Sequence, residues 1–167
     1  VFSKGAIILR SIKEERSKEA RAILPALHKN FNIVQEISNG YVDGGDLLYT
    51  PDGVIIGLSS RTTLDGANSL IKCLKKIGEK GFILNVPKDV LHLKSDCSLL
   101  DERTILLTTR LANEAIFSGF KRVVVPSSEL GAANSLRINA AVFMGEEYPQ
   151  SISRVKALGF NVLALPT

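Results

Sequence analysis

The segment from Tyr41 to Thr50 reads YVDGGDLLYT and places Asp43 and Asp46 on either side of two glycines. A plain turn needs only one Asp-Gly pair to reverse the chain, so the second carboxylate is a candidate for chemistry. His92, in VLHLKSDCS, follows a predicted strand and is flanked by two leucines. A carboxylate such as Asp43 could fix the tautomer of its imidazole and support the protonated form, as a general acid/base requires.

Both histidines also have a structural interpretation. A histidine between apolar residues, as His92 is, is more often a hydrogen-bonded core residue than a catalyst, so the catalytic interpretation depends on its carboxylate partner. His28 ends a predicted helix beside Lys29, where a cation suits the helix dipole. We therefore expect His28 to be structural or solvated.

Two arginines could bind a carboxylate. Arg61, in LSSRTT, follows a predicted strand at the start of a helix, where it is either an exposed charge beside a Ser/Thr cap or a clamp for a carboxylate. A guanidinium binds a carboxylate through a bidentate fork. Arg16, in KEERSKE, is on sequence grounds a solvated helix charge.

The two cysteines offer little chemistry by themselves. Cys73 adjoins the apolar stripe of a predicted helix and is expected to be a small core residue. Cys97 lies in the same loop as His92, and neighbours within one loop rarely reach the geometry of nucleophilic attack. The sequence shows no glycine-rich phosphate loop, no metal-ligand cluster and no G-x-S-x-G elbow, so we expect neither cofactor nor metal.

The composition is that of an ordinary globular chain. It has 167 residues, of which 45% are hydrophobic and 23% charged, and a formal net charge of +4. This length predicts a single domain over residues 1–167. The basic residues are scattered, so nucleic-acid binding is not indicated, and neither a membrane span nor a signal peptide is apparent. We expect a cytoplasmic protein, with a homo-oligomer as an open option.

The elements that must position these residues repeat along the chain. An apolar strand, an amphipathic helix and a second apolar strand recur, and a short polar segment that ends in another extended piece separates one unit from the next. Such ββαβ modules pack side by side with equivalent loops on one face, so the loops of Asp43, His92 and Asn134 should meet. A doubly wound sheet without symmetry is the alternative. The expected strand–helix–strand units are 6–11, 14–28 and 32–37; 53–59, 63–78 and 81–87; 104–110, 111–118 and 122–126; and 140–145, 149–158 and 161–166. The expected apolar face is Ala20, Ile23, Leu24 and Leu27 on the first helix and Ala67, Leu70, Ile71 and Leu74 on the second.

Four segments taken together resemble a known family. VDGGDLLYT, GLSSRTTLDGA, LHLKSDCSLL and GEEYPQS, in this order, are similar to the dimethylarginine dimethylaminohydrolases of the guanidino-group modifying superfamily. The resemblance covers essentially the whole chain. It implies the pentein fold, an α/β (α+β) propeller of five modules about a pseudo-fivefold axis, of which about four are present here.

The resemblance also implies roles for single residues. His92 would be the general acid/base and Asp43 its carboxylate partner, while Asp46 would be mainly structural. Arg61 matches the arginine that binds the α-carboxylate of the substrate, and Arg16 falls where the family has a second arginine in a mobile flap. The implied reaction releases a methylamine and citrulline from methylated arginine through a cysteine nucleophile and needs no cofactor.

The sequence departs from the family at both ends. The family's nucleophile follows the strand that matches NVLALPT, and Cys97 does not match its position. The catalytic cysteine and the acids that hold the guanidinium are therefore expected outside this chain, which would be an incomplete ring, either a fragment of a longer enzyme or a natural short form. We expect the chain alone not to turn over substrate.

Two other functions stay open. Arginine deiminases and amidinotransferases belong to the same superfamily, but deiminases carry an acid two residues after the histidine, where this chain has Lys94. That difference favours the dimethylarginine type. A non-catalytic pentein-fold protein that binds the ribosome is the second alternative, although such a protein has no reason to keep Asp43, His92 and Arg61 together.

Overall fold

The computed structural model describes residues 1–166, apart from the side chain of Ser17. Its contacts divide the chain into two compact units, Val1–Leu93 and Lys94–Thr167. The single domain expected over residues 1–167 stays a prediction. Within the described residues, no helix is both long enough and apolar enough to cross a bilayer.

The first unit begins with a parallel pair of strands joined through helices. Strand β1 (Ala6–Ile8) pairs with β2 (Val34–Glu36), and α1 (Glu14–Ala22) and α2 (Leu24–Asn30) lie between them in the sequence. The single helix expected over 14–28 is wrong, because Pro25 cannot continue a helix but is accepted in the first turn of a new one. Its expected apolar face is only half-buried: Ile23 is 51% exposed, and Ala20, Leu24 and Leu27 are partly exposed.

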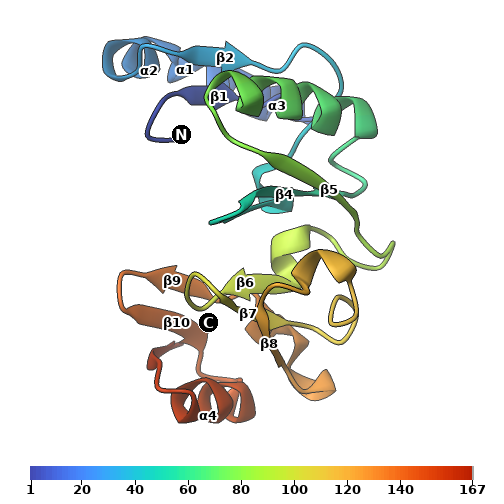
Figure 1. Cartoon of the computed structure of the whole chain (residues 1–167), viewed down its shortest axis with the longest axis vertical. Helices are drawn as coiled ribbons and strands as arrows, with labels where there is room; N and C mark the ends of the chain where they lie inside the picture. The colour runs from blue at the N-terminus through green and yellow to red at the C-terminus, as the bar shows by residue number, and fades with distance from the viewer. Residues whose placement is uncertain (167) are drawn as a thin grey trace. The chain divides into compact units, whose positions relative to one another are not determined.

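The rest of the first unit is a complete ββαβ module. Strand β3 (Leu47–Thr50) runs antiparallel to β4 (Gly53–Leu58), which runs parallel to β5 (Gly81–Asn85). Helix α3 (Leu64–Lys76) connects β4 to β5 and lies between this sheet and the β1–β2 pair (Figure 1). The predicted stripe of α3 is confirmed, because Ala67, Leu70 and Leu74 are each no more than 1% exposed.

The second unit begins with a module that lacks an α-helix. Strands β6 (Cys97–Leu99) and β7 (Thr104–Leu107) are antiparallel, and β7 and β8 (Lys121–Val124) are parallel. The helix expected over 111–118 is wrong: the connection holds only the 3₁₀ turn η3 (Ala115–Phe117). The backbone of Glu114 is extended in the middle of this segment, which interrupts a helix, and the segment buries Leu111 and Phe117 singly.

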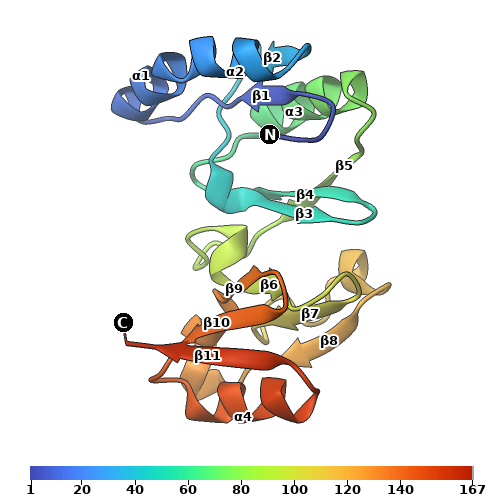
Figure 2. The same cartoon turned by 90° about the vertical axis from the view of Figure 1, so that its left-hand side faces the viewer.

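The last module follows the expected order. Strand β9 (Leu136–Ile138) pairs antiparallel with β10 (Ala141–Gly145), and β10 pairs parallel with β11 (Asn161–Leu165). Helix α4 (Pro149–Ala157) joins β10 to β11 and runs alongside β11 (Figure 2). Val142, Met144 and Val162 face α4 and form a core with Val155.

The three complete sheets share one design. Each has a central strand with an antiparallel partner before it and a parallel partner after it, and a 3₁₀ turn leads into the antiparallel strand. These turns are η1 (Gly44–Asp46), η2 (Leu93–Ser95) and η4 (Ser127–Ala133). The predicted repeat of mixed sheets is therefore confirmed. Two candidate site residues, Asp43 and His92, directly precede the turns η1 and η2.

Candidate functional site

Asp46 is the centre of a buried polar cluster in the first unit. Its side chain is fully buried, and its carboxylate accepts hydrogen bonds from Ser59 Oγ at 2.6 Å and Thr62 Oγ1 at 2.7 Å. The backbone N–H of Leu93 donates to the other carboxylate oxygen at 3.0 Å. Asp46 therefore ties η1 to the loop after β4 and to the segment that carries His92, as the structural role expected for it requires.

His92 lies against η1. Its Nδ1 is 3.5 Å from Oδ1 of Asp46, and its side chain is 16% exposed. Nδ1 itself is buried and has no hydrogen-bond partner within the described structure. A Cβ atom on Gly45 would lie 2.7 Å from Cγ of His92, so only glycine lets the backbone approach the ring this closely.

Asp43, the expected partner of His92, has other neighbours. It is 8% exposed, and its carboxylate accepts from the Gly45 N–H at 2.9 Å and from Nη1 of Arg16 at 3.3 Å. Its own N–H donates to Thr62 Oγ1 at 3.0 Å. Among the described residues Asp43 makes no ion pair with His92, and the carboxylate nearest to Nδ1 belongs to Asp46. The role of Asp43 as partner of His92 stays a prediction.

Arg16 reaches Asp43 from helix α1. The side chain of Arg16 is 56% exposed, whereas that of Asp43 is 9% exposed. The sequence alone suggested a solvated charge, and the structure adds an ion pair at the edge of the site. Because Arg16 is mostly exposed, this pair is weak and easily exchanged for a ligand.

Arg61 is held by its backbone in the loop between β4 and α3. Its N–H donates to Ser59 Oγ at 3.0 Å, and Thr62 beside it is 1% exposed. Within the described part of the chain, the guanidinium of Arg61 makes no hydrogen bond or ion pair. The base of this side chain is therefore fixed while its charged end is available to a ligand.

A cavity of about 310 Å³ adjoins the ion pair. Ser11, Arg16, Asp43 and Gly44 supply its polar wall, and apolar side chains, among them those of β1, α1 and α2, supply the rest. Ala20, Ile23 and Leu27, which the sequence assigns to one apolar face, line this cavity. That face is half-buried because it borders a cavity and not a packed core.

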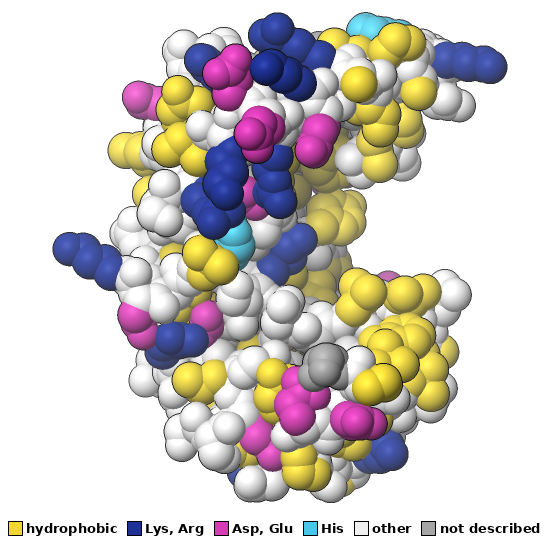
Figure 3. All heavy atoms as spheres, turned by 180° about the vertical axis from the view of Figure 1, so that it is seen from behind, with side chains coloured by type: hydrophobic (Ala, Val, Ile, Leu, Met, Phe, Trp, Pro, Cys, Tyr) yellow, Lys and Arg dark blue, Asp and Glu magenta, His cyan; other side chains and the backbone are white. Residues whose placement is uncertain are grey.

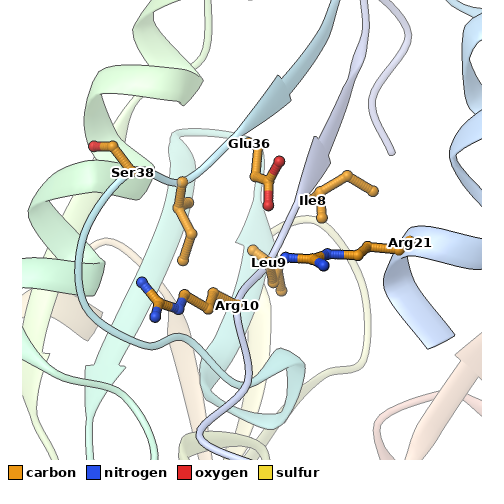
Figure 4. A pocket seen from close by; sticks show the side chains of 7 residues that line it. Ile8, Leu9, Arg10, Arg21, Glu36 and Ser38 are labelled. Carbon is orange, nitrogen blue, oxygen red and sulfur yellow. The ribbon is translucent and has the colours of Figure 1, made fainter. Parts of the chain in front are cut away.

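A second cavity, of about 460 Å³, lies at the ends of β1 and β2 (Figure 4). Arg10, Arg21, Glu36 and Ser38 line it together with apolar side chains of the two strands. Arg10 also stacks over Tyr41, with its guanidinium carbon 5.2 Å from the ring centroid. Sequence reasoning missed this cavity, since its charges are scattered singly along the chain.

Neither cysteine has the surroundings of a nucleophile. Burial raises the pKa of the Cys73 thiol, which belongs to the core under α3, in agreement with its expected role. Burial and then the Asp96 carboxylate raise the pKa of the Cys97 thiol far above its ordinary value, and its side chain is fully buried. A thiol that stays protonated cannot attack. Among the described residues there is also no group of three His, Cys, Asp or Glu placed to hold a metal ion.

Ser59 and Thr62 are the site residues that sequence reasoning passed over. Both donate to Asp46, and Thr62 also accepts from the Asp43 backbone. The hydroxyl-rich run LSSRTT was interpreted as a helix cap, and only Thr63 acts in that way, accepting from the Gly66 N–H at 3.1 Å. The sequence signal for them is the presence of hydroxyl residues before Thr63 that the helix cap does not need.

Comparison with known proteins identifies the family. A family model for arginine deiminase matches residues 4–136. The chain belongs to the arginine deiminase family. The pentein-type fold expected from the sequence is therefore confirmed in its mixed-sheet modules, and the placement of the modules about an axis stays a prediction.

Individual relatives are dimethylarginine hydrolases. The chain is 31% identical over 167 residues to N(G),N(G)-dimethylarginine dimethylaminohydrolase of Pseudomonas aeruginosa, covering 99% of this chain and 65% of the relative. It is 29% identical over 162 residues to the enzyme of the same name from Streptomyces coelicolor, covering 95% and 61% of the two chains. A crystal structure of a cysteine-to-serine variant of the P. aeruginosa enzyme complexed with citrulline matches with a TM-score of 0.92 and 30% identity, covering all of this chain and 66% of that one. The chain thus spans less than two thirds of the length of these two relatives.

Proposed function

We propose that this chain supplies the acid/base and carboxylate-binding part of a hydrolase that acts on the guanidino group of methylated arginine. The observation that carries the proposal is the cluster around η1 in the first unit, where Arg16 and Asp43 line a cavity and His92 lies against the same turn. The kinship with dimethylarginine hydrolases supports the same reaction class. Figure 3 shows basic side chains gathered with acidic ones and a histidine on one face, as a ligand with both a carboxylate and a guanidinium would need.

The proposed roles follow the charges of the site. His92 would give a proton to the leaving amine and take one from the attacking water. Arg61, whose guanidinium has no partner among the described residues, would bind the α-carboxylate of the substrate through its fork. Asp43 is a nearly buried carboxylate paired with an exposed arginine, so a cationic substrate group could replace Arg16 at little cost.

The covalent step needs a thiolate that neither Cys73 nor Cys97 can provide, since burial keeps both protonated. In the proposed reaction a cysteine from another segment attacks the guanidinium carbon and forms a C–S bond. The C–N bond to the methylamine then breaks as His92 delivers a proton to the nitrogen. Water hydrolyses the resulting thiouronium, which gives citrulline and restores the thiol.

Methylated arginine is favoured over arginine as the substrate. Deiminases resemble this sequence but have an acid where Lys94 stands, and that acid would hold an unsubstituted guanidinium. Lys94 is exposed and carries a positive charge, so it offers the substrate guanidinium neither attraction nor a hydrogen-bond acceptor. The identity to two dimethylarginine hydrolases points to the same substrate class.

Replacing His92 with alanine tests the proposal, with His28→Ala as the matched control. The assay requires a protein that carries this chain and spans the length of its relatives, with citrulline release from dimethylarginine as the readout. We expect His92→Ala to lower kcat by at least about 100-fold, the usual worth of a general acid/base, without a comparable loss of stability. His28 is exposed, and its replacement should leave kcat unchanged. A folded His92→Ala protein with normal turnover would refute the proposal.

A further inference from the structure

The contact between His92 and Asp46 indicates a role for Asp46 that the proposed function does not include. Nδ1 of His92 is buried without a hydrogen-bond partner in the described structure, and the charged atom beside it is Oδ1 of Asp46, at 3.5 Å. The resemblance to dimethylarginine hydrolases implied a mainly structural role for Asp46 and no contact with His92.

We propose that Asp46 is a positioning residue that holds neutral His92 in the tautomer with its proton on Nδ1. A lone pair on Nδ1 would face the negative Oδ1 without water between them, whereas an N–H bond there points a positive hydrogen at it. The hydrogen bond that one ring nitrogen makes decides which nitrogen carries the proton. Nε2 then keeps its lone pair and is the nitrogen that can exchange a proton with a substrate.

Asp46 is built to hold this position. Its carboxylate is fully buried, and three donors fix it: Ser59 Oγ, Thr62 Oγ1 and the Leu93 N–H. The Leu93 N–H follows His92 directly, so the same carboxylate orients the backbone and the ring of the histidine segment. A carboxylate held by three hydrogen bonds cannot rotate away from the ring.

The imidazole is fixed from a second side. Gly45, next to Asp46, lies so close to the ring that a Cβ there would be 3.0 Å from both Nδ1 and Cδ2. The ring therefore cannot turn toward the backbone of η1. Since Nδ1 is buried, the 16% of the side chain that stays exposed belongs to its other atoms.

The two acids of this turn, Asp43 at its N-cap and Asp46 within it, contact different groups. Asp43 accepts from Arg16 and from Gly45, and its charge is directed toward the cavity. Asp46 is directed toward the histidine. This inference rests on the proposed function only for the use of Nε2 in catalysis, and the tautomer itself depends on the cluster alone.

Nitrogen-15 NMR of the 167-residue chain tests the proposal without any substrate. The chain has two histidines, so long-range ¹H–¹⁵N spectra at an alkaline pH show two imidazoles, and a His28→Gln variant assigns them. We expect the His92 ring to be predominantly protonated at Nδ1. A His92 ring that is predominantly protonated at Nε2 would overturn the proposal, and this needs no variant of the cluster to fold.

Variants then show whether the charge of Asp46 is the cause. In Asp46→Asn we expect at least half of the His92 population to move to the Nε2 form, with His28 unchanged. Ser59→Ala removes a donor from the carboxylate but keeps its charge, so the Nδ1 form should persist there. A folded Asp46→Asn chain with the wild-type tautomer would contradict the proposal. Because the readout involves no turnover, its outcome is separate from that of the hydrolase assay.

Discussion

Asp43 and Asp46 are the same residue type three positions apart, but their carboxylates have different partners. Both are nearly or fully buried, yet Asp43 pairs with an exposed arginine and Asp46 with two hydroxyls and a backbone N–H. The first carboxylate can exchange its partner for a ligand, and the second cannot. The two glycines between them also differ, and this difference yields a sharp test.

Gly45→Ala and Gly44→Ala form a matched pair of substitutions in one turn. A Cβ at Gly45 would meet the His92 ring at 2.7 Å, whereas a Cβ at Gly44 meets nothing within 4 Å. We expect Gly45→Ala to lower the free energy of unfolding by about 1–3 kcal/mol, the usual cost of overpacking. Gly44→Ala should be within about 1 kcal/mol of the wild type. Urea unfolding followed by circular dichroism measures both, and equal stabilities for the two variants would contradict the placement of His92.

Arg61→Lys tests the carboxylate clamp. Lysine keeps the charge but lacks the fork, so hydrogen bonds to the substrate carboxylate worth about 1.5–3 kcal/mol are lost. In the protein that spans the length of its relatives, we expect kcat/KM to fall roughly 10- to 100-fold, chiefly through KM. Arg137→Lys, at an exposed arginine of β9, is the control and should have no effect. An unchanged KM in Arg61→Lys would remove Arg61 from the site.

The sequence offered candidate residues for the site but not their contacts. Asp43, His92 and Arg61 could be singled out because their residue types match a chemistry. The approach of Asp46 to His92 depends on how η1 packs against a segment far along the chain, and no local pattern encodes that. The hydroxyls of Ser59 and Thr62 are ambiguous in the sequence for the same reason, since the same letters cap a helix or bind a carboxylate.

At the scale of elements, local signals predicted each strand but not each connection. Alternating and continuous apolar runs end near the observed strand ends. The stripe of α3 is visible in the sequence because its apolar residues recur at helical spacing, and six residues of the helix are buried in the structure. The helix of 14–28 divides at Pro25, and that of 111–118 shrinks to η3. Apolar residues continue through both segments, but Pro25 divides the first helix and the extended backbone of Glu114 interrupts the second.

Helix α4 depends on a carboxylate outside it, and this makes the second unit sensitive to acid. Glu129 on η4 accepts from the N–H groups of Gln150 at 3.0 Å and Ser151 at 2.8 Å in the first turn of α4. Burial alone would raise the pKa of Glu129, but these hydrogen bonds and the Arg154 charge outweigh it, so the pKa lies below its ordinary value of 4.5. A lowered folded-state pKa stabilises the fold above the unfolded-state value, and this is lost as the pH falls through the folded-state pKa.

We therefore expect Glu129→Gln to reduce stability at neutral pH and to flatten its dependence on pH below about 4.5. Circular dichroism during acid titration would measure this. Glu102→Gln is the control, because Glu102 is exposed in the same unit. If both variants follow the acid transition of the wild type, Glu129 does not cap α4.

At the scale of the whole molecule, one sheet face of the second unit stays uncovered. Leu136, Ile138, Leu163 and Leu165 are 43–59% exposed, and the strand register places them on one face of the β9–β10–β11 sheet. The opposite face carries Val142, Met144 and Val162 in the core. Alternation along a strand shows that a sheet has two faces but not which one is left without a partner, so the sequence could not predict this exposure.

This exposed face predicts self-association of the isolated chain, because contiguous apolar surface of this kind is uncommon on monomers. Replacing Leu136 and Leu163 together with lysine should shift the sedimentation profile toward the monomer. Leu158→Lys is the control: Leu158 is 39% exposed but lies at the end of α4, which packs on the other face. A wild-type chain that sediments as a monomer at all concentrations would contradict the prediction.

The central claim is that this chain belongs to a hydrolase of methylated arginine. The most direct measurement compares kcat/KM for dimethylarginine and for arginine, in a protein that carries this chain and spans the length of its relatives. We predict release of citrulline and dimethylamine, with dimethylarginine preferred by at least about tenfold, as a pocket contact that distinguishes methyl groups allows. Faster release of ammonia from arginine, or no citrulline from a folded protein, would contradict the account.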